Sequence, residues 1–338
     1  MDQKIDQENM RQVILDSPSQ LTQGLALAKD IKIPSNFNSI VISGMGGSAL
    51  PGDILKIYLD DLFQKNSDQN SHLTVLQNRT YALPAEAYKN SLNIFASYSG
   101  NTEETLSSLE EALKAKLPAI GISSGGKLAE ICQKNNIPLV SLPAGIQPRC
   151  ASGYFFSAIL GILAKAEKIE NPSENIAQAQ KKLSEQISDL EKQGAEIAKK
   201  LFEKIPIIYA SEKFRALAMI WKIKINENAK TPAFYNSYPE LNHNEMVGFT
   251  LPQGKFHLIN LTNQTDHPQT LKRINITSEI LAKKNIQNTR IEMNSSNILD
   301  SIFSTLLLGD WVSYYLALEY GQDPTPVAMV ENLKQQLT

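Results

Sequence analysis

Ser97-Tyr98-Ser99-Gly100-Asn101-Thr102 lies between an apolar run and a segment with helical periodicity. The apolar run, residues 92–96, predicts a buried parallel strand, because such strands are covered on both faces. Leucine and alanine recur at helical spacing in residues 103–116, which predicts a helix with Thr102 as its N-cap. The loop hydroxyls and the N–H groups of that helix start together favour binding of a phosphate monoester. A loop that only caps its helix would have the same composition and is the alternative.

A second loop of small residues follows an earlier predicted strand, residues 39–43. Gly44-Met45-Gly46-Gly47-Ser48 leads from this strand into a helix that begins at Ala49 and ends near residue 62. Two adjacent glycines let a ligand approach the backbone, and Ser48 adds a hydroxyl at a helix start. The spacing also fits a dinucleotide fingerprint, but the next strand ends in Gln77-Asn78-Arg79, without the acidic residue that binds the ribose. Two serine-bearing loops in one sheet therefore favour a sugar phosphate.

The composition is that of a folded protein long enough for two domains: 338 residues, 42% hydrophobic and 20% charged. A net charge of −2 without a basic cluster predicts neither a nucleic-acid nor a membrane partner. Two cysteines, Cys132 and Cys150, make neither a disulfide framework nor a metal motif, so we expect no metal. Residues 1–9 are polar and no apolar run reaches about 18 residues, which predicts a cytoplasmic protein without a transmembrane helix.

Strands and helices alternate along the chain, which predicts an α/β fold with doubly wound parallel sheets. Helices are expected first at 5–15 and 21–28. The first sheet is then expected to use strands 39–43, 73–76, 92–96, 119–122 and 138–141, with helices at 127–134 and 152–164 besides those named above. An amphipathic helix over 174–204 is expected to connect this domain to a second one.

The second α/β unit is expected to begin at residue 205. Its predicted strands are 207–210, 257–261 and 289–293, and its predicted helices are 214–229, 270–284, 298–319 and 327–336. We therefore expect an N-terminal domain over 1–168, a helical connector over 169–204 and a C-terminal domain over 205–338. The second unit has no counterpart of the 97–102 loop, so one phosphate site per chain is predicted.

Several motifs, in order, resemble those of one enzyme family. The two loops resemble the sugar isomerase (SIS) domain. Asn226-Glu227-Asn228-Ala229-Lys230, the segment 239–245 and Asp323-Pro324-Thr325-Pro326-Val327 extend the resemblance, over nearly the whole chain, to the bifunctional phosphoglucose/phosphomannose isomerase family. The resemblance implies two SIS-type, flavodoxin-like domains. It also implies a cofactor-independent isomerase that interconverts glucose 6-phosphate and mannose 6-phosphate with fructose 6-phosphate through a cis-enediolate.

The same resemblance implies roles for individual residues. Glu227 would be the base that moves a proton between C1 and C2, and Arg149 would stabilise the enediolate. His243, supplied by the neighbouring subunit of a homodimer, would open the sugar ring with Lys334, and Thr325 would line the sugar. The phosphate-binding residues would be Gly46, Gly47, Ser48, Ser97, Ser99 and Thr102.

Position alone leaves blander interpretations open. Glu227 and Lys334 could be solvent-facing helix residues, and Arg149 could cap or pair structurally. Glu240 and Glu245 could orient the His243 imidazole or be loop charges, and the second reading is favoured for Glu245. At the level of the whole chain, the alternatives are an SIS-domain regulator that senses a phosphosugar without catalysis and an isomerase of another phosphosugar. A regulator would keep the loops without Glu227, His243 and Arg149 together.

Overall fold

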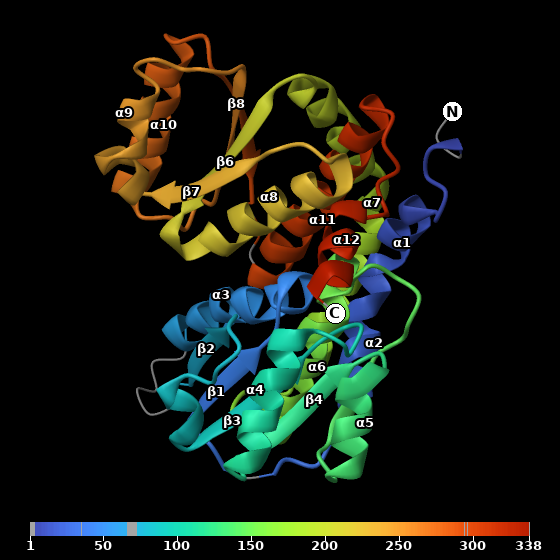
Figure 1. The fold of residues 1–338 in the computed structure, drawn as a ribbon. Helices are drawn as coiled ribbons and strands as arrows, with labels where there is room; N and C mark the ends of the chain where they lie inside the picture. Colours follow the sequence, from blue (N-terminus) through green and yellow to red (C-terminus); the bar gives the residue numbers. More distant parts are fainter. Residues whose placement is uncertain (1–3, 35, 66–72, 294, 296, 338) are drawn as a thin grey trace. The chain divides into compact units, whose positions relative to one another are not determined.

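The computed structural model describes residues 4–34, 36–65, 73–293, 295 and 297–337 (Figure 1). The chain divides into two compact units. The N-terminal unit is Asp16–Ser184, and the C-terminal unit combines Met1–Leu15 with Glu185–Thr338. The boundary falls within one long helix, α7 (Ser173–Leu201), which covers most of the predicted connector. The predicted domain limits 1–168, 169–204 and 205–338 stay a prediction.

The N-terminal unit is built on a five-stranded parallel sheet with the order β2-β1-β3-β4-β5. Its strands are β1 (Ser39–Ser43), β2 (Thr74–Asn78), β3 (Ser91–Ala96), β4 (Ala119–Ser123) and β5 (Leu139–Ser141). This strand order is flavodoxin-like. The alternation predicted a doubly wound parallel sheet, and the family resemblance implied its flavodoxin-like type. The strand order reverses between the neighbours β1 and β3, so the two serine-bearing loops leave the sheet side by side. Ligands of such sheets bind at this crevice.

Helices cover both faces of this sheet: α2 (Gln20–Leu27), α3 (Leu50–Lys65), α4 (Glu103–Lys114), α5 (Gly126–Lys134) and α6 (Ser152–Lys165). Figure 1 shows α4 and α5 on one face, where Leu109 of α4 and Leu128 of α5 join a buried cluster with Phe95 of β3. α3 and α6 contact one another through the edge-to-face rings of Tyr58 and Phe156, 5.8 Å apart. Burial on both faces explains why β1 and β3 read as continuous apolar runs.

The C-terminal unit repeats the same plan with four parallel strands in the order β7-β6-β8-β9. The strands are β6 (Ile205–Ser211), β7 (Phe234–Tyr238), β8 (Phe256–Thr262) and β9 (Gln287–Glu292). β7 is not among the strands that the sequence pattern predicts. It is an edge strand with Asn236 and Ser237 in its middle, and only its last two residues are buried, so it lacks the apolar run of the other strands.

The helices of the C-terminal unit are α1 (Met10–Asp16), part of α7, α8 (Arg215–Ala229), α9 (Glu245–Gly248), α10 (Pro268–Ala282), α11 (Ile298–Glu319) and α12 (Ala328–Leu337). α8 and α11 pack together, with a 2.5 Å ion pair between Lys224 and Asp310, while α9 and α10 lie on the other face of the sheet (Figure 1). α11 is long and apolar enough to cross a membrane, which the sequence analysis did not expect of any segment. However, 78% of its apolar window is buried inside the protein, as in a core helix.

Candidate active site

The loop after β3 presents its hydroxyl groups to one another. Ser97 is fully buried, and its Oγ lies 2.8 Å from Oγ1 of Thr102 and accepts a hydrogen bond from the Thr102 N–H. Thr102 is the N-cap residue of α4, as predicted, but its side chain makes no capping hydrogen bond. The hydroxyls are therefore not used up by the helix, which argues against the capping-only interpretation. Ser99 is exposed at the tip of the loop.

The loop after β1 is joined directly to this one. Oγ of Ser48 accepts a 2.9 Å hydrogen bond from the Tyr98 N–H, so a side chain of the loop after β1 holds the backbone of the loop after β3. Gly46 is exposed and has a φ of +50°, a conformation that glycine adopts readily. The structure thus brings all six predicted phosphate-binding residues onto two adjoining loops at the carboxyl end of β1 and β3.

A third loop, which the sequence analysis missed, packs against the 97–102 loop. It joins β4 to α5, contains Gly125 and leads into Gly126, the first residue of α5. A Cβ on Gly100 would lie 1.8 Å from the Gly125 carbonyl oxygen, and a Cβ on Gly126 would lie 2.4 Å from that of Ser99. The Lys127 N–H also donates to Asn101 Oδ1 at 3.1 Å. The adjacent glycines after an apolar run, residues 119–122, were the available signal for this loop.

Arg149 belongs to the same loop cluster. It lies in a short 3₁₀ helix, Pro148–Cys150, and only 2% of it is exposed. A Cβ on Gly47 would lie 2.4 Å from the Arg149 backbone nitrogen, so this helix rests directly on the glycine-rich loop. The guanidinium Nη1 donates to Oε1 of Gln147 at 3.4 Å. A buried guanidinium next to the loops is well suited to an anionic oxygen, because it is a planar cation with several N–H donors in a fixed geometry.

Glu227 lies in the last turn of α8, and its side chain is half-buried. Both neighbouring asparagines anchor this turn. Asn226 Nδ2 donates to the Thr231 carbonyl at 2.8 Å, and the buried Asn228 donates to Oγ of Ser313 on α11 at 2.9 Å. The helix end that carries the predicted base is therefore held from two sides.

His243 is exposed at the end of a 3₁₀ helix, Glu240–His243, that follows β7. Asn242 Nδ2 ties this helix to Thr277 Oγ1 of α10 at 2.8 Å, and Asn244 Nδ2 donates to Oε1 of Glu240 at 2.7 Å. Within the part of the chain that the structure describes, neither Glu240 nor Glu245 hydrogen-bonds to His243.

Glu245 is not a loop charge, contrary to the favoured reading. Its two carboxylate oxygens accept hydrogen bonds from the Tyr209 hydroxyl of β6 and from Nδ2 of Asn236 of β7. Burial of the ring, and then the nearby Glu245 carboxylate, raise the pKa of Tyr209. The carboxylate thus anchors α9, and the His243 segment before it, to the sheet.

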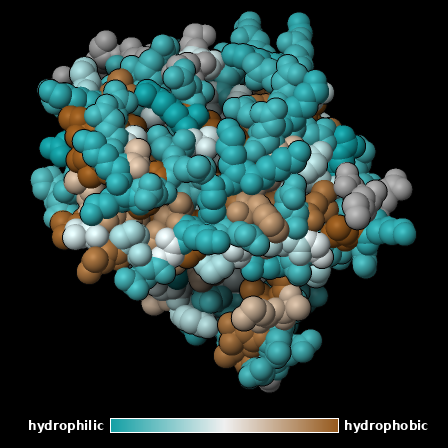
Figure 2. Space-filling model, turned by 90° about the horizontal axis from the view of Figure 1, so that it is seen from above, coloured by the Kyte–Doolittle hydropathy of each residue, from teal (hydrophilic) through white to brown (hydrophobic). Residues whose placement is uncertain are grey.

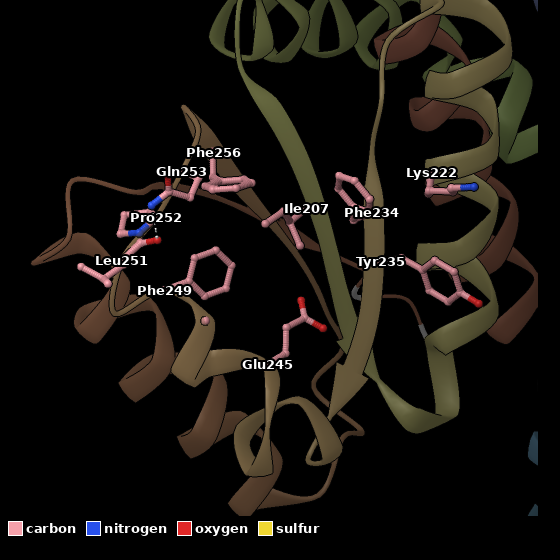
Figure 3. Close-up of a pocket in the computed structure, with 11 residues that line it drawn as sticks. Ile207, Lys222, Phe234, Tyr235, Glu245, Phe249, Leu251, Pro252, Gln253 and Phe256 are labelled. Carbon is pink, nitrogen blue, oxygen red and sulfur yellow. Dashed lines mark hydrogen bonds between the residues drawn. The ribbon is translucent and has the colours of Figure 1, made fainter.

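The same carboxylate points into a cavity of about 510 Å³ (Figure 3). Most of the lining is apolar: Ile207, Phe234, Phe249, Leu251, Pro252 and Phe256. Of this lining, Leu251 and Phe234 are also exposed at the surface. The face seen in Figure 2 is largely hydrophilic, with hydrophobic residues in smaller separate groups. None of the predicted site residues lines this cavity, and its apolar wall does not suit a phosphate.

The last two predicted residues lie near the end of the C-terminal unit. Thr325 is buried, with 4% exposed, and its N–H donates to Oδ1 of Asp323 at 3.0 Å. Lys334 is exposed on α12 and forms a 2.7 Å ion pair with Glu331. The predicted residues therefore separate into the loop cluster with Arg149 in the N-terminal unit, and Glu227, His243, Thr325 and Lys334 in the C-terminal unit. Among the described residues, no three His, Cys, Asp or Glu side chains are grouped as metal ligands would be.

Comparisons with known proteins find relatives over most of the chain. Residues 190–337 match a family model described as the bacterial phospho-glucose isomerase C-terminal SIS domain. A bifunctional phosphoglucose/phosphomannose isomerase of Caldicellulosiruptor bescii is 34% identical over 97% of this chain and 98% of that protein. A D-glucosamine-6-phosphate 4-epimerase of Sulfolobus acidocaldarius is 32% identical over 68% of this chain and 70% of its own length. The solved tagatose-6-phosphate ketose/aldose isomerase of Escherichia coli shares the fold, with a TM-score of 0.62 at 17% identity over 93% of both chains.

Proposed function

This chain belongs to the bifunctional phosphoglucose/phosphomannose isomerase family, and we propose that it interconverts glucose 6-phosphate and mannose 6-phosphate with fructose 6-phosphate. The observation that carries the proposal is the pair of joined serine loops with the buried Arg149 against them. Hydroxyls and helix N–H groups would hold the phosphate, and the guanidinium would face the reacting end of the sugar. We further propose that the protein works in the cytoplasm in carbohydrate metabolism.

The proposed reaction needs only proton transfers. With Lys334, His243 would move a proton from the O1 hydroxyl to O5, which breaks the C1–O5 bond and gives the open-chain aldose. Glu227 would then take the proton from C2 to form a cis-enediolate and return it to C1, while the proton of the O2 hydroxyl passes to O1, which gives the ketose. Arg149 would stabilise the enediolate oxygen, and Thr325 would line the sugar. Rotation about C2–C3 in the open chain lets one carboxylate serve both epimers.

The test is a coupled assay of the purified protein on both 6-phosphates, together with Glu227→Gln. The substitution preserves the shape of the side chain but removes the base, so kcat should fall by at least about 10² for both substrates. Loss of one activity alone would contradict a shared base. Binding without turnover in the wild type would favour the regulator.

The 32% identity to an epimerase gives a specific second candidate, epimerisation of glucosamine 6-phosphate at C4. The same preparation should therefore be incubated with that sugar and the product sugars separated. A C4 epimer formed faster than fructose 6-phosphate would replace the isomerase proposal.

We also propose a homodimer in which His243 acts in the partner's active site. The exposure of His243 on its own chain supports this, since a side chain that works across an interface must project from its subunit. Glu227→Gln and His243→Gln should each be nearly inactive alone. Mixed after dissociation and reassembly, they should recover roughly a quarter of wild-type activity, because half the dimers would carry one intact site of two. No recovery would place His243 in the site of its own chain.

A further inference from the structure

The backbone conformation at Lys230 does not favour a lysine. It follows α8 directly and has a φ of +58°, the left-handed conformation in which helices commonly end. Glycine is the preferred residue there, because any Cβ is strained at this φ. A lysine at such a position therefore needs a reason in its side chain.

The side chain provides one by joining two separate segments. Its Nζ lies 2.5 Å from the Glu227 carbonyl oxygen and 3.1 Å from the Pro324 carbonyl oxygen. The first carbonyl belongs to the last turn of α8, where carbonyls lack partners within the helix and a cation is favourable. The second belongs to the segment 323–326, which contains Thr325 and leads into α12. The ammonium thus links the residue of the proposed base to the segment of the proposed sugar-lining residue.

The end of α4 shows that the cap alone does not require this link. Lys116 follows α4 with a φ of +55°, and its side chain is exposed. In the part of the chain described by the structure, no hydrogen bond or ion pair is made by the Lys116 ammonium, and α4 ends normally without one. The two lysines share a backbone conformation and differ in what the side chain holds.

We propose that Lys230 is a positioning residue of the proposed active site. It holds the 323–326 segment, and with it Thr325 and the start of α12, against the end of α8 that presents Glu227. This inference rests on the proposed function. Lys230 would act through these segments and would not take part in the proton transfers.

The experiment compares Lys230→Gly with Lys116→Gly and Lys230→Arg. Both glycine variants relieve left-handed strain, so both should keep or raise the melting temperature. Lys116→Gly should keep wild-type kcat. Lys230→Gly should lose about tenfold or more in kcat with a smaller change in KM, because misplaced groups slow the chemical step. Lys230→Arg, which can donate to both carbonyls, should restore part of the loss.

Hydrogen exchange separates this proposal from the proposed function. Exchange at the backbone amides of Thr325 and of residues 327–330 should be faster in Lys230→Gly than in Lys116→Gly, whatever reaction the wild type catalyses. If the wild type were inactive towards glucose 6-phosphate, mannose 6-phosphate and glucosamine 6-phosphate, the proposed function would be wrong. The exchange measurement would still test the role of Lys230. Unchanged exchange and kcat in Lys230→Gly, or a kcat loss that only follows a lower melting temperature, would overturn the role of Lys230.

Discussion

His257 is a single buried side chain that should make stability depend on pH. It lies on β8 with 2% of its surface exposed, and its Nε2 is 2.8 Å from Oγ1 of Thr289. Burial, with Lys204 and Lys200 nearby, lowers its pKa from the ordinary 6.5 to about 4. The unfolded chain therefore binds more protons than the native one between these two values, so the stability owed to this group is complete above about pH 6.5 and falls as the pH drops towards 4.

We predict that His257→Gln flattens this dependence. Between pH 7 and 4, the wild type should lose on the order of 3 kcal/mol of unfolding free energy through this residue, and the variant should lose correspondingly less. Urea unfolding at several pH values measures the slope. An equally steep slope in the variant would assign the titration to other groups.

The individual side-chain contacts of the site could not be predicted from the sequence. The serines of both loops were predictable, because a hydroxyl-rich turn between a strand and a helix is a local pattern. The roles of Glu245 and Lys230 were not, since Glu245 meets Tyr209 from a distant strand and Lys230 meets Pro324 near the end of the chain. A sequence pattern relates residues that are close along the chain, whereas these side chains contact residues that are close only in the folded protein.

At the scale of elements, the predicted strands β1 and β3 were confirmed because continuous apolar runs mark a covered parallel sheet. β7 could not be predicted from an apolar run, because an edge strand needs only one neighbouring strand. Its pairing with β6 is therefore compatible with polar residues. What decides the candidate site at this scale is the close packing of three loops and one 3₁₀ helix. That packing depends on glycines whose absent side chains leave room for the backbone of another element.

Gly47→Ala tests that packing. The added Cβ would lie 2.4 Å from the Arg149 backbone nitrogen, and backbone cannot turn aside as a flexible side chain can. We expect a loss of about 1–3 kcal/mol or more in unfolding free energy, together with reduced activity as Arg149 is displaced. Gly248→Ala is the control, because a Cβ there meets nothing within 4 Å. A Gly47→Ala protein as stable and active as this control would mean that the space between the loop and Arg149 can accommodate a Cβ.

At the scale of the whole molecule, the two units share a strand order but differ in the loops at corresponding positions. The loop after β8 corresponds in topology to the 97–102 loop after β3. Its donors are already used: Asp266 accepts from the Asn263 N–H at 3.0 Å, and His267 Nδ1 accepts from the Gln269 N–H at 3.1 Å. Pro268 opens α10 and has no N–H at all. α4, by contrast, begins without any side-chain cap.

We therefore predict one sugar phosphate bound per chain, through the N-terminal unit alone. Calorimetric titration with fructose 6-phosphate should give a stoichiometry near one. Ser97→Ala combined with Thr102→Ala should weaken binding by about tenfold or more, because each lost charge-assisted hydrogen bond costs about 1.5–3 kcal/mol. Asp266→Asn keeps the shape of the loop after β8 and should leave both the affinity and the stoichiometry as in the wild type. Two sites per chain, or full affinity in the double variant, would show that the repeated fold binds phosphate by a route that the loop after β3 does not provide.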